Sequence, residues 1–450
     1  MIRRIAVAAL LLGVGFAQED PTSRMEQVVQ SYVSAKQFMG SVLVAREGKV
    51  LLSHGYGSAN FEWGVPNSPT TKFRLGSITK QFTAACILLL EERGKLKTDD
   101  LVKKYLPNAP AAWDKITIYH LLTHTSGIPS FTGFPDYAST EAVKTTPEKL
   151  VERFRDKPLE FQPGEKWNYS NSGYVLLGYL IERISGQGYS EFVQQNIFDP
   201  LGMKDSGYDS NSAIIPHRAE GYTAKPKGLE HAGYIDMSIP FSAGALYSTT
   251  EDLLRWEQGL FGGKLLSASS VQKMTTAFKS NYAFGLGVRD DKGHKVIEHG
   301  GGIEGFNTQL AYYPDDKLVV AVLGNLNGGA PSAIAAKLAS VAHGEKVVLA
   351  SERKEVTVSP NILAAYVGTY ELAPNFQFVI TLEGDHLVSQ ATGQSRIPIF
   401  PESETLFFPK VVDAEIEFVK NDKGETTHMI LHQNGHVTKG VKVAEPQKTQ

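Results

Sequence analysis

The sequence predicts an α+β fold with one antiparallel sheet flanked by helices, followed by a small all-β domain of barrel-like form. Strand-like segments lie at both ends of the first 345 residues and helical patterns lie between them, which favours one antiparallel sheet with helices packed against it. Beyond residue 360 the pattern changes to short alternating runs separated by turns that contain glycine. A chain of 450 residues is long enough for two or three domains of ordinary size.

The first predicted element of the α+β unit is a hairpin with strands at 40–45 and 49–53 and a turn at Glu47-Gly48. A helix from Ser77 to about Arg93 follows, and Gly94 provides its C-terminal stop. Further helices are predicted at 147–155, 172–185, 189–198 and 250–258. Later strands are predicted at 282–288, 295–299, 308–313 and 318–323, and a helix at 330–343 completes the unit.

The domain boundaries follow from the change of pattern. We expect the α+β unit at 18–345, a linker at 346–360 and the β domain at 361–450. Alternating runs of the β domain cover 376–382, 405–408, 414–419 and 428–431. Turn signals separate them at 383–385, 422–424 and 434–435.

The N-terminus has the pattern of an export signal. Arg3 and Arg4 form a short basic start, residues 5–16 are apolar, and small residues precede the expected cleavage after Ala17. We therefore expect residues 1–17 to be a signal peptide and the protein to be exported, to the periplasm or the extracellular space. The single cysteine, Cys86, excludes an intrachain disulfide and is expected in the core.

Charge excludes one class of partner. The formal net charge is −3 and no long basic run is present, so nothing in the composition favours nucleic-acid binding. We expect no nucleic-acid partner.

Ser77-Ile78-Thr79-Lys80 is the most informative segment for chemistry. A serine hydroxyl needs a nearby base before it can act as a nucleophile. Residues three apart lie on one face of a helix, so Ser77 and Lys80 can share a site without any long-range contact. A lysine removed from water can lose its charge and accept a proton.

Two further segments complete a pattern of three motifs. They are Tyr169-Ser170-Asn171, ahead of a predicted helix, and His299-Gly300-Gly301-Gly302, after a predicted strand. With them the chain to about residue 345 resembles the class C β-lactamase-like, penicillin-recognising serine hydrolases, a family that includes D-alanyl-D-alanine carboxypeptidases, D-aminopeptidases and family VIII carboxylesterases. The segments 120–127, 200–203 and 243–249 support the resemblance, and the C-terminal region resembles lipocalin-like domains appended to some of these peptidases.

The resemblance implies a role for each motif residue. Ser77 would attack a carbonyl and form an acyl-enzyme, while Lys80 and Tyr169 would share the proton transfers. Asn171 would hold Lys80 and the substrate amide, and the backbone N–H groups of Ser77 and Gly302 would form the oxyanion hole. His299 and Gly301 would bind substrate, and the chemistry needs no cofactor and no metal.

His299 is a departure, because the family frequently has lysine at this position. We expect a histidine there to titrate near neutral pH and to attract a substrate carboxylate only conditionally, which counts against efficient β-lactam hydrolysis. The substrate is expected to be a small molecule or peptide, and a cell-wall polymer is a further possible partner. The sequence does not predict an oligomeric state.

The leading hypothesis is a D-amino-acid-specific peptidase, of carboxypeptidase or aminopeptidase type. A carboxylesterase is the first alternative, because the aromatic segment 131–137 is suited to line an apolar acyl pocket. A β-lactamase is the second alternative, and a non-catalytic peptidoglycan-binding protein is an alternative of another class.

Two other groups of histidines are not interpreted as metal ligands. His120 and His124 lie four residues apart, but no glutamate follows the first of them and no nearby carboxylate completes a ligand set. His428, His432 and His436 span a strand and an Asn-Gly turn, and we expect them at the surface.

Overall fold

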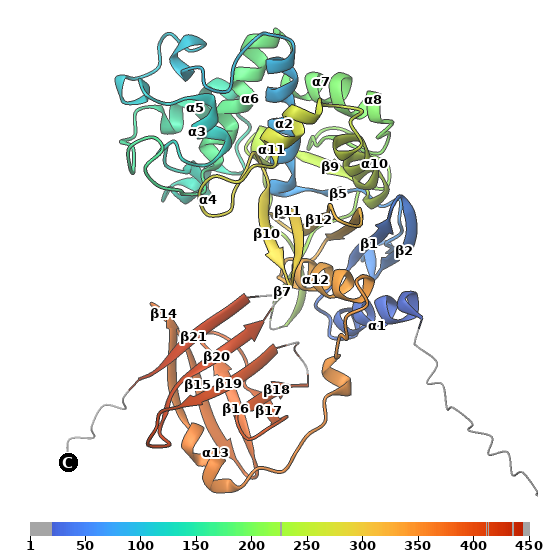
Figure 1. The fold of residues 1–450 in the computed structure, drawn as a ribbon, viewed down its shortest axis with the longest axis vertical. Helices are drawn as coiled ribbons and strands as arrows, with labels where there is room; N and C mark the ends of the chain where they lie inside the picture. Colours follow the sequence, from blue (N-terminus) through green and yellow to red (C-terminus); the bar gives the residue numbers. More distant parts are fainter. Residues whose placement is uncertain (1–19, 226, 411, 413, 434–435, 444–450) are drawn as a thin grey trace, which may run out of the picture.

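A computed structural model describes residues 20–443 except 226, 411, 413, 434 and 435. The predicted signal peptide and the predicted turn at 434–435 lie outside the described residues. The predicted fold class is confirmed: a mixed helix and sheet unit precedes a closed antiparallel barrel (Figure 1).

A six-stranded antiparallel sheet forms the centre of the first unit, in the order β10-β11-β12-β13-β1-β2. The strands are β1 (Gly40–Arg46), β2 (Lys49–Tyr56), β10 (Gly287–Asp291), β11 (His294–Ile303), β12 (Phe306–Tyr313) and β13 (Leu318–Gly324). Central strands β1 and β13 are apolar on both faces. Val42 and Val44 enter one core cluster and Leu43 and Ala45 enter another, so both faces of the sheet are covered.

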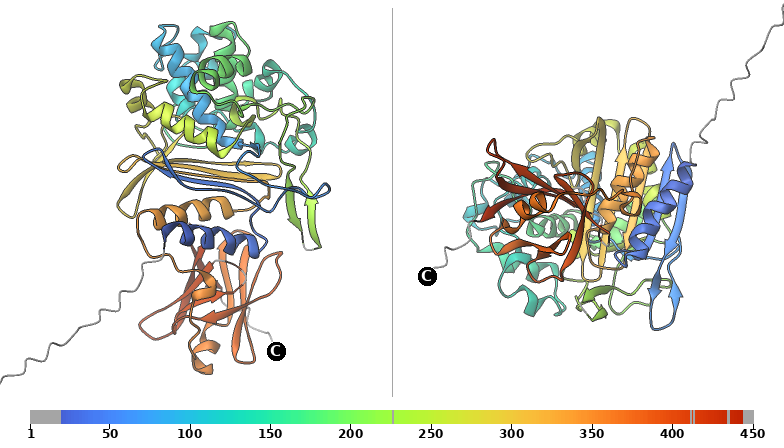
Figure 2. Two further views of the ribbon diagram at one scale, coloured as in Figure 1. Left: turned by 90° about the vertical axis from the view of Figure 1, so that its right-hand side faces the viewer. Right: turned by 90° about the horizontal axis from the view of Figure 1, so that it is seen from below.

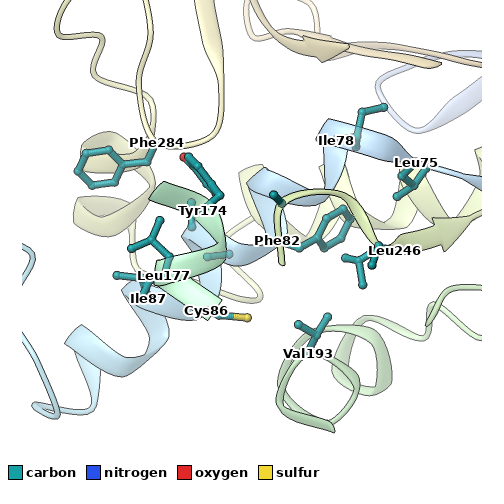
Figure 3. Packing of buried hydrophobic residues seen from close by; sticks show 14 of the residues in the cluster. Leu75, Ile78, Phe82, Cys86, Ile87, Tyr174, Leu177, Val193, Leu246 and Phe284 are labelled. Carbon is teal, nitrogen blue, oxygen red and sulfur yellow. The ribbon is translucent and has the colours of Figure 1, made fainter. Parts of the chain in front are cut away.

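Helices cover the two faces unequally. On one face lie α1 (Pro21–Ser34) and α12 (Ala330–Ala342), and on the other lies a larger helical layer (Figure 2). That layer contains α2 (Thr79–Glu92), α3 (Ile118–Leu122), α4 (Tyr137–Thr140), α5 (Pro147–Arg155), α6 (Asn171–Ser185), α7 (Tyr189–Val193), α8 (Asp199–Leu201), α9 (Phe241–Gly244), α10 (Thr250–Phe261) and α11 (Ala268–Met274). Helix α2 is buried over nearly its whole length and packs on α6 and α9 (Figure 3).

Short elements connect these layers. Small strand pairs are formed by β3 (Ser58–Asn60) with β4 (Val65–Pro66), by β9 (Leu246–Ser248) with both β5 (Phe73–Arg74) and β6 (Gly207–Tyr208), and by β7 (Tyr222–Lys225) with β8 (Gly228–His231). Single helical turns are η1 (Gly76–Ile78), η2 (Val102–Lys104), η3 (Ala111–Trp113), η4 (Phe131–Gly133), η5 (Gln194–Phe198) and η6 (Ala350–Glu352).

The C-terminal barrel is built from eight consecutive antiparallel strands, and pairing of the first with the last closes it. The strands are β14 (Gly368–Ala373), β15 (Phe376–Glu383), β16 (His386–Ala391), β17 (Ile397–Pro401), β18 (Leu406–Pro409), β19 (Ala414–Lys420), β20 (Thr426–Gln433) and β21 (His436–Val443). Helix α13 (Pro360–Tyr366) contributes Tyr366, which stacks on Phe418 in the barrel core. The barrel lies on the α1 and α12 side of the sheet, away from the larger helical layer (Figure 2).

Two details of the predicted elements were wrong, and helix α1 was missed. The segment 282–286 is irregular rather than a strand, because Gly285 (φ +69°) brings the chain against α2, where a Cβ would lie 2.6 Å from the Lys80 carbonyl oxygen. The predicted helix start at Ser77 is a 3₁₀ turn, η1, and the α-helix begins at Thr79. Helix α1 was not predicted, although Asp20 caps it and Pro21 occupies its first turn, a position that proline favours.

No helix among residues 20–443, the few undescribed positions aside, combines the length and the apolar character needed to cross a membrane.

Glu257 in α10 is a buried carboxyl group that should make the stability of the protein depend on pH. Its side chain is buried against the sheet, Oε2 has no hydrogen-bond partner among the described residues, and burial raises the pKa of the carboxyl from 4.5 to about 8. Between these values the folded protein holds a proton that the unfolded chain has released, so the free energy of unfolding falls as pH rises, by about 1.4 kcal/mol per pH unit at most.

We expect Glu257→Gln to remove this dependence and to stabilise the protein at pH 8, measured by urea unfolding at pH 5, 6.5 and 8. Equal slopes of unfolding free energy against pH in wild type and variant would contradict the assignment.

Candidate active site

Ser77 and Lys80 lie together at the junction of the sheet and the larger helical layer. Ser77 is in the 3₁₀ turn η1 and Lys80 is in the first turn of α2. The fully buried Lys80 Nζ lies 2.9 Å from Ser77 Oγ, 2.9 Å from Asn171 Oδ1 and 2.8 Å from the Ala243 carbonyl oxygen. Three chain segments therefore converge on one amine.

The surroundings of Lys80 favour a neutral amine. Burial holds the pKa of Lys80 well below its ordinary 10.5. The Ala243 carbonyl and the Asn171 amide oxygen only accept hydrogen bonds, so a neutral Lys80 donates its two N–H groups to them. Its lone pair then faces Ser77 Oγ. This geometry allows Lys80 to accept the Ser77 proton.

Asn171 is held in place by Thr132 in η4 and by Ser130, the residue before that turn. Asn171 is the first residue of α6, whose N-cap is Ser170. Its Nδ2 donates to Thr132 Oγ1 at 3.1 Å and its backbone N–H donates to Ser130 Oγ at 3.1 Å. These bonds direct the amide oxygen of Asn171 toward Lys80.

Tyr169 is half-buried beside the same amine. Its ring centre lies 4.8 Å from Lys80 Nζ and 4.3 Å from the His124 ring. Burial raises the pKa of Tyr169, and a hydrogen bond with the Ser77 side chain lowers it by less. Tyr169 is therefore a neutral phenol at physiological pH, able to donate a proton but poor at accepting one.

His299 does not behave as the sequence predicts. Its Nδ1–H donates to the Gly300 carbonyl at 2.6 Å, and its Nε2 accepts from the Tyr282 hydroxyl at 3.0 Å. Burial is the main cause that lowers the pKa of His299 to about 4. The expectation of titration near neutral pH is therefore wrong: His299 is a neutral imidazole and offers no positive charge to a substrate carboxylate.

The glycines of the third motif allow β11 to approach η1. A Cβ on Gly301 would lie 1.9 Å from the Leu75 carbonyl oxygen, and one on Gly76 (φ +54°) would lie 2.8 Å from the Gly302 nitrogen. Only glycine permits this close approach of two backbones. It brings the backbone of Gly302 beside that of Ser77.

Ser77 lies between two cavities. The first, of about 190 Å³, is lined by Gly76, Ser77, Phe131, Thr132, Tyr137, Asn171, Ile235, Pro240, Ala243, Gly244, Gly302, Ile303 and Glu304. The second, of about 350 Å³, is lined by Ser77, Tyr169, His299, Gly300, Gly301, Gly302, Asn307, Thr308, Gly328, Gly329, Pro331 and Ser332. Six of the seven predicted site residues line one or both cavities. The seventh, Lys80, lines neither of them but contacts Ser77 Oγ.

Sequence reasoning missed several neighbours of these residues. Thr132 and Ser130 hold Asn171, and Tyr282 holds His299. The Ala243 carbonyl is a backbone group, so no side-chain pattern could have revealed it. Thr132 lies in the segment that was predicted as an apolar pocket, and its hydroxyl was the available signal.

His120 and His124 support the local backbone. His120 Nδ1 accepts from the Thr117 N–H at 3.2 Å at the start of α3. His124 lies beyond the end of α3 with φ +56°, and its Nδ1 accepts from the Ser170 N–H at 3.1 Å. Burial lowers the pKa of both imidazoles.

One group among the described residues has metal-ligand chemistry. Ligand atoms of His294, His343 and Glu345 lie within 4.8 Å of one another. However, the two imidazoles stack face to face at 3.8 Å, and the Lys292 ammonium lies 2.8 Å from the Glu345 carboxylate. A cation at this carboxylate opposes metal binding.

A nucleophile at a helix start, a buried lysine and a β-strand edge opposite them define a serine hydrolase of the β-lactamase and transpeptidase fold. The chain belongs to the beta-lactamase family, whose sequence profile matches residues 25–344. Residues 352–445 match a domain of unknown function, DUF3471, which covers the barrel.

Penicillin-binding proteins are among its relatives. The chain is 29% identical to Penicillin-binding protein 4* of Bacillus subtilis, over 94% of this chain and 99% of that protein. It is 32% identical to the putative penicillin-binding protein PbpX of Bacillus subtilis, over 68% of this chain and 75% of that protein.

Solved structures agree with this placement. The octameric penicillin-binding protein homologue from Pyrococcus abyssi has a TM-score of 0.65 at 28% identity, over 93% of this chain and 99% of that chain. A D-stereospecific amidohydrolase from Streptomyces has a TM-score of 0.61 at 27% identity, over 71% of this chain and 98% of that chain.

The protonation of His299 gives a first prediction. Because its pKa lies near 4, the imidazole should keep a single proton, on Nδ1, from pH 5 to pH 8. Nitrogen-15 NMR of histidine-labelled protein measures this, and His299→Gln identifies the signal. Titration of that signal with a midpoint between pH 6 and 7 would disprove it.

The close approach of β11 to η1 gives a second prediction. Gly301→Ala should lower the free energy of unfolding by about 1–3 kcal/mol and abolish turnover, because the new methyl group meets backbone atoms. Gly302→Ala is the matched control, since its Cβ would meet only the Asn307 side chain, at 3.3 Å. Similar unfolding curves for both variants would contradict the packing argument.

Proposed function

We propose that this chain is an exported hydrolase that cleaves amides of D-amino acids, as a D-amino-acid-specific peptidase, through an acyl-enzyme on Ser77. The contacts of Lys80 are the observation that supports this most strongly. A buried amine with two obligate acceptors and one serine hydroxyl around it is arranged to remove the serine proton.

The proposed acylation begins with Lys80. Its neutral Nζ takes the Ser77 proton while Oγ attacks the substrate carbonyl. The N–H groups of Ser77 and Gly302 stabilise the oxyanion, each worth about 3 kcal/mol in the transition state. The new positive charge on Nζ lies 4.8 Å from the Tyr169 ring centre, where a cation–π interaction stabilises it.

Tyr169 is the proposed acid in the second half of acylation. Its phenol gives a proton to the leaving nitrogen as the C–N bond breaks, and Lys80 returns the Ser77 proton to Tyr169, so the net transfer is from serine to leaving group. Water then attacks the acyl-enzyme and regenerates Ser77. Lys80 and Tyr169 were both considered as the base that accepts the Ser77 proton. The raised pKa of Tyr169 and the lowered pKa of Lys80 favour Lys80 in this role.

The proposed proton transfers indicate which part of the substrate would occupy each cavity. A leaving group protonated by Tyr169 occupies the second cavity, which Tyr169 and His299 line. The acyl group then occupies the first cavity, between Asn171 and the aromatic rings of Phe131 and Tyr137. A neutral His299 gives no charge for a leaving group that bears a carboxylate, which favours amide or aminopeptidase substrates over a carboxypeptidase reaction.

The D-amino-acid preference rests on the relatives. A D-stereospecific amidohydrolase shares the fold at 27% identity, and penicillin-binding proteins are among the sequence relatives. Export rests on the predicted signal at residues 1–17. A carboxylesterase is the second candidate, since Phe131 and Tyr137 in the first cavity also suit an apolar acyl group.

A rate panel tests the proposal. Wild type should hydrolyse D-phenylalanine p-nitroanilide, and Ser77→Ala and Lys80→Gln should each lower kcat/KM at least about 1,000-fold without changing the unfolding curve. Ser269→Ala, on the exposed face of α11, is the serine control. Hydrolysis of p-nitrophenyl butyrate in the same set of assays tests the esterase alternative, and hydrolysis of a chromogenic cephalosporin tests the β-lactamase alternative.

Turnover that survives in Ser77→Ala would reject the mechanism. Stable acylation by a β-lactam with no turnover of any substrate would instead identify the non-catalytic binding protein.

A further inference from the structure

Glu304 is a charged side chain in the first cavity that the proposed chemistry does not use. It lies in the two-residue turn between β11 and β12, five positions after His299. Among the described residues that line this cavity with Ser77, it is the only charged one. The other walls are aromatic, aliphatic or small polar groups.

One oxygen of the Glu304 carboxylate lacks a partner among the described residues, although a hydrogen bond from the backbone N–H of Glu304 reaches the carboxylate. Its Oε2 is buried and accepts no hydrogen bond from any described residue. The charge of Arg74 lowers the pKa of Glu304, but the Arg74 side chain donates a hydrogen bond to the buried Asp209 carboxylate at 2.7 Å. A half-buried carboxylate in this condition is costly, and a ligand that brings a cation with N–H donors would satisfy it.

The neighbours of Glu304 reinforce this electrostatic preference. Burial and the charge of Glu141 raise the pKa of Glu304, and its own charge contributes to raising the pKa of Tyr137 in the same wall. The cavity therefore disfavours binding of a second anion and favours binding of a cation.

We propose that Glu304 binds the free α-ammonium group of the acyl residue, so that the enzyme acts on amides or peptides whose reacting residue has an unblocked amine. The apolar walls formed by Phe131, Tyr137 and Ile235 then receive the side chain of that residue. This assignment rests on the proposed function, because it needs the acyl group to occupy the first cavity.

The assignment distinguishes substrates by one feature, the charge on the amine. An α-ammonium has a pKa near 8, so it is mostly charged at pH 7, and acetylation removes the charge without changing the side chain. A charge-assisted hydrogen bond in a desolvated site changes binding by about 10- to 100-fold.

The experiment compares D-phenylalanine p-nitroanilide with its N-acetyl derivative at pH 7. Wild type should prefer the free amine, and Glu304→Gln, which keeps the shape and removes the charge, should lower kcat/KM for the free amine about 10- to 100-fold and for the acetylated substrate less than about 3-fold. Glu141→Gln is the matched control, because this carboxylate is near Glu304 but does not line the cavity.

Two results would overturn the assignment: equal rates of wild type on both substrates, or equal losses on both substrates in Glu304→Gln. Hydrolysis of p-nitrophenyl butyrate, which has no amine, reports on Ser77 separately. If that activity depends on Ser77 while the amine preference is missing, the role of Glu304 fails and the acyl-enzyme mechanism stands.

Discussion

The burial of Lys80 without an acidic partner is the constraint on which the rest of the site depends. An ammonium in this position is costly, so the site favours the neutral amine that a serine nucleophile needs. No described residue places a carboxylate against Nζ, and its contacts are a hydroxyl, an amide oxygen and a backbone carbonyl. A single acidic neighbour would hold Lys80 charged and remove the base.

The two halves of the molecule build this environment together. The helical layer supplies Lys80, Asn171 and the Ala243 carbonyl, whereas the sheet supplies His299 and the backbone of Gly302. Close packing of η1 against β11 joins the halves, and Gly301 makes that packing possible. The barrel takes no part in the described cavities beside Ser77 and lies on the opposite face of the sheet (Figure 2).

Local periodicity and motif order predicted much of this. Ser77 and Lys80 are one turn apart whatever the tertiary structure, and Tyr169, Asn171 and His299 follow in the order that the resemblance requires. The charge state of His299 could not be predicted, because it depends on burial and on a hydrogen bond with Tyr282, a residue outside the three sequence motifs. Glu304 was missed because a Glu-Gly turn between strands usually faces solvent. Strands β14, β16, β17 and β21 were missed because their alternation is weak.

The pKa of Lys80 is the measurement that tests this account most directly. Carbon-13 NMR of protein labelled at the lysine Cε position, with Lys80→Gln to identify the signal, follows its protonation with pH. We expect a midpoint well below the ordinary 10.5, and Ser77→Ala should leave the midpoint low because burial is the cause. A Lys80 signal that stays in its ammonium form up to pH 10 would contradict it.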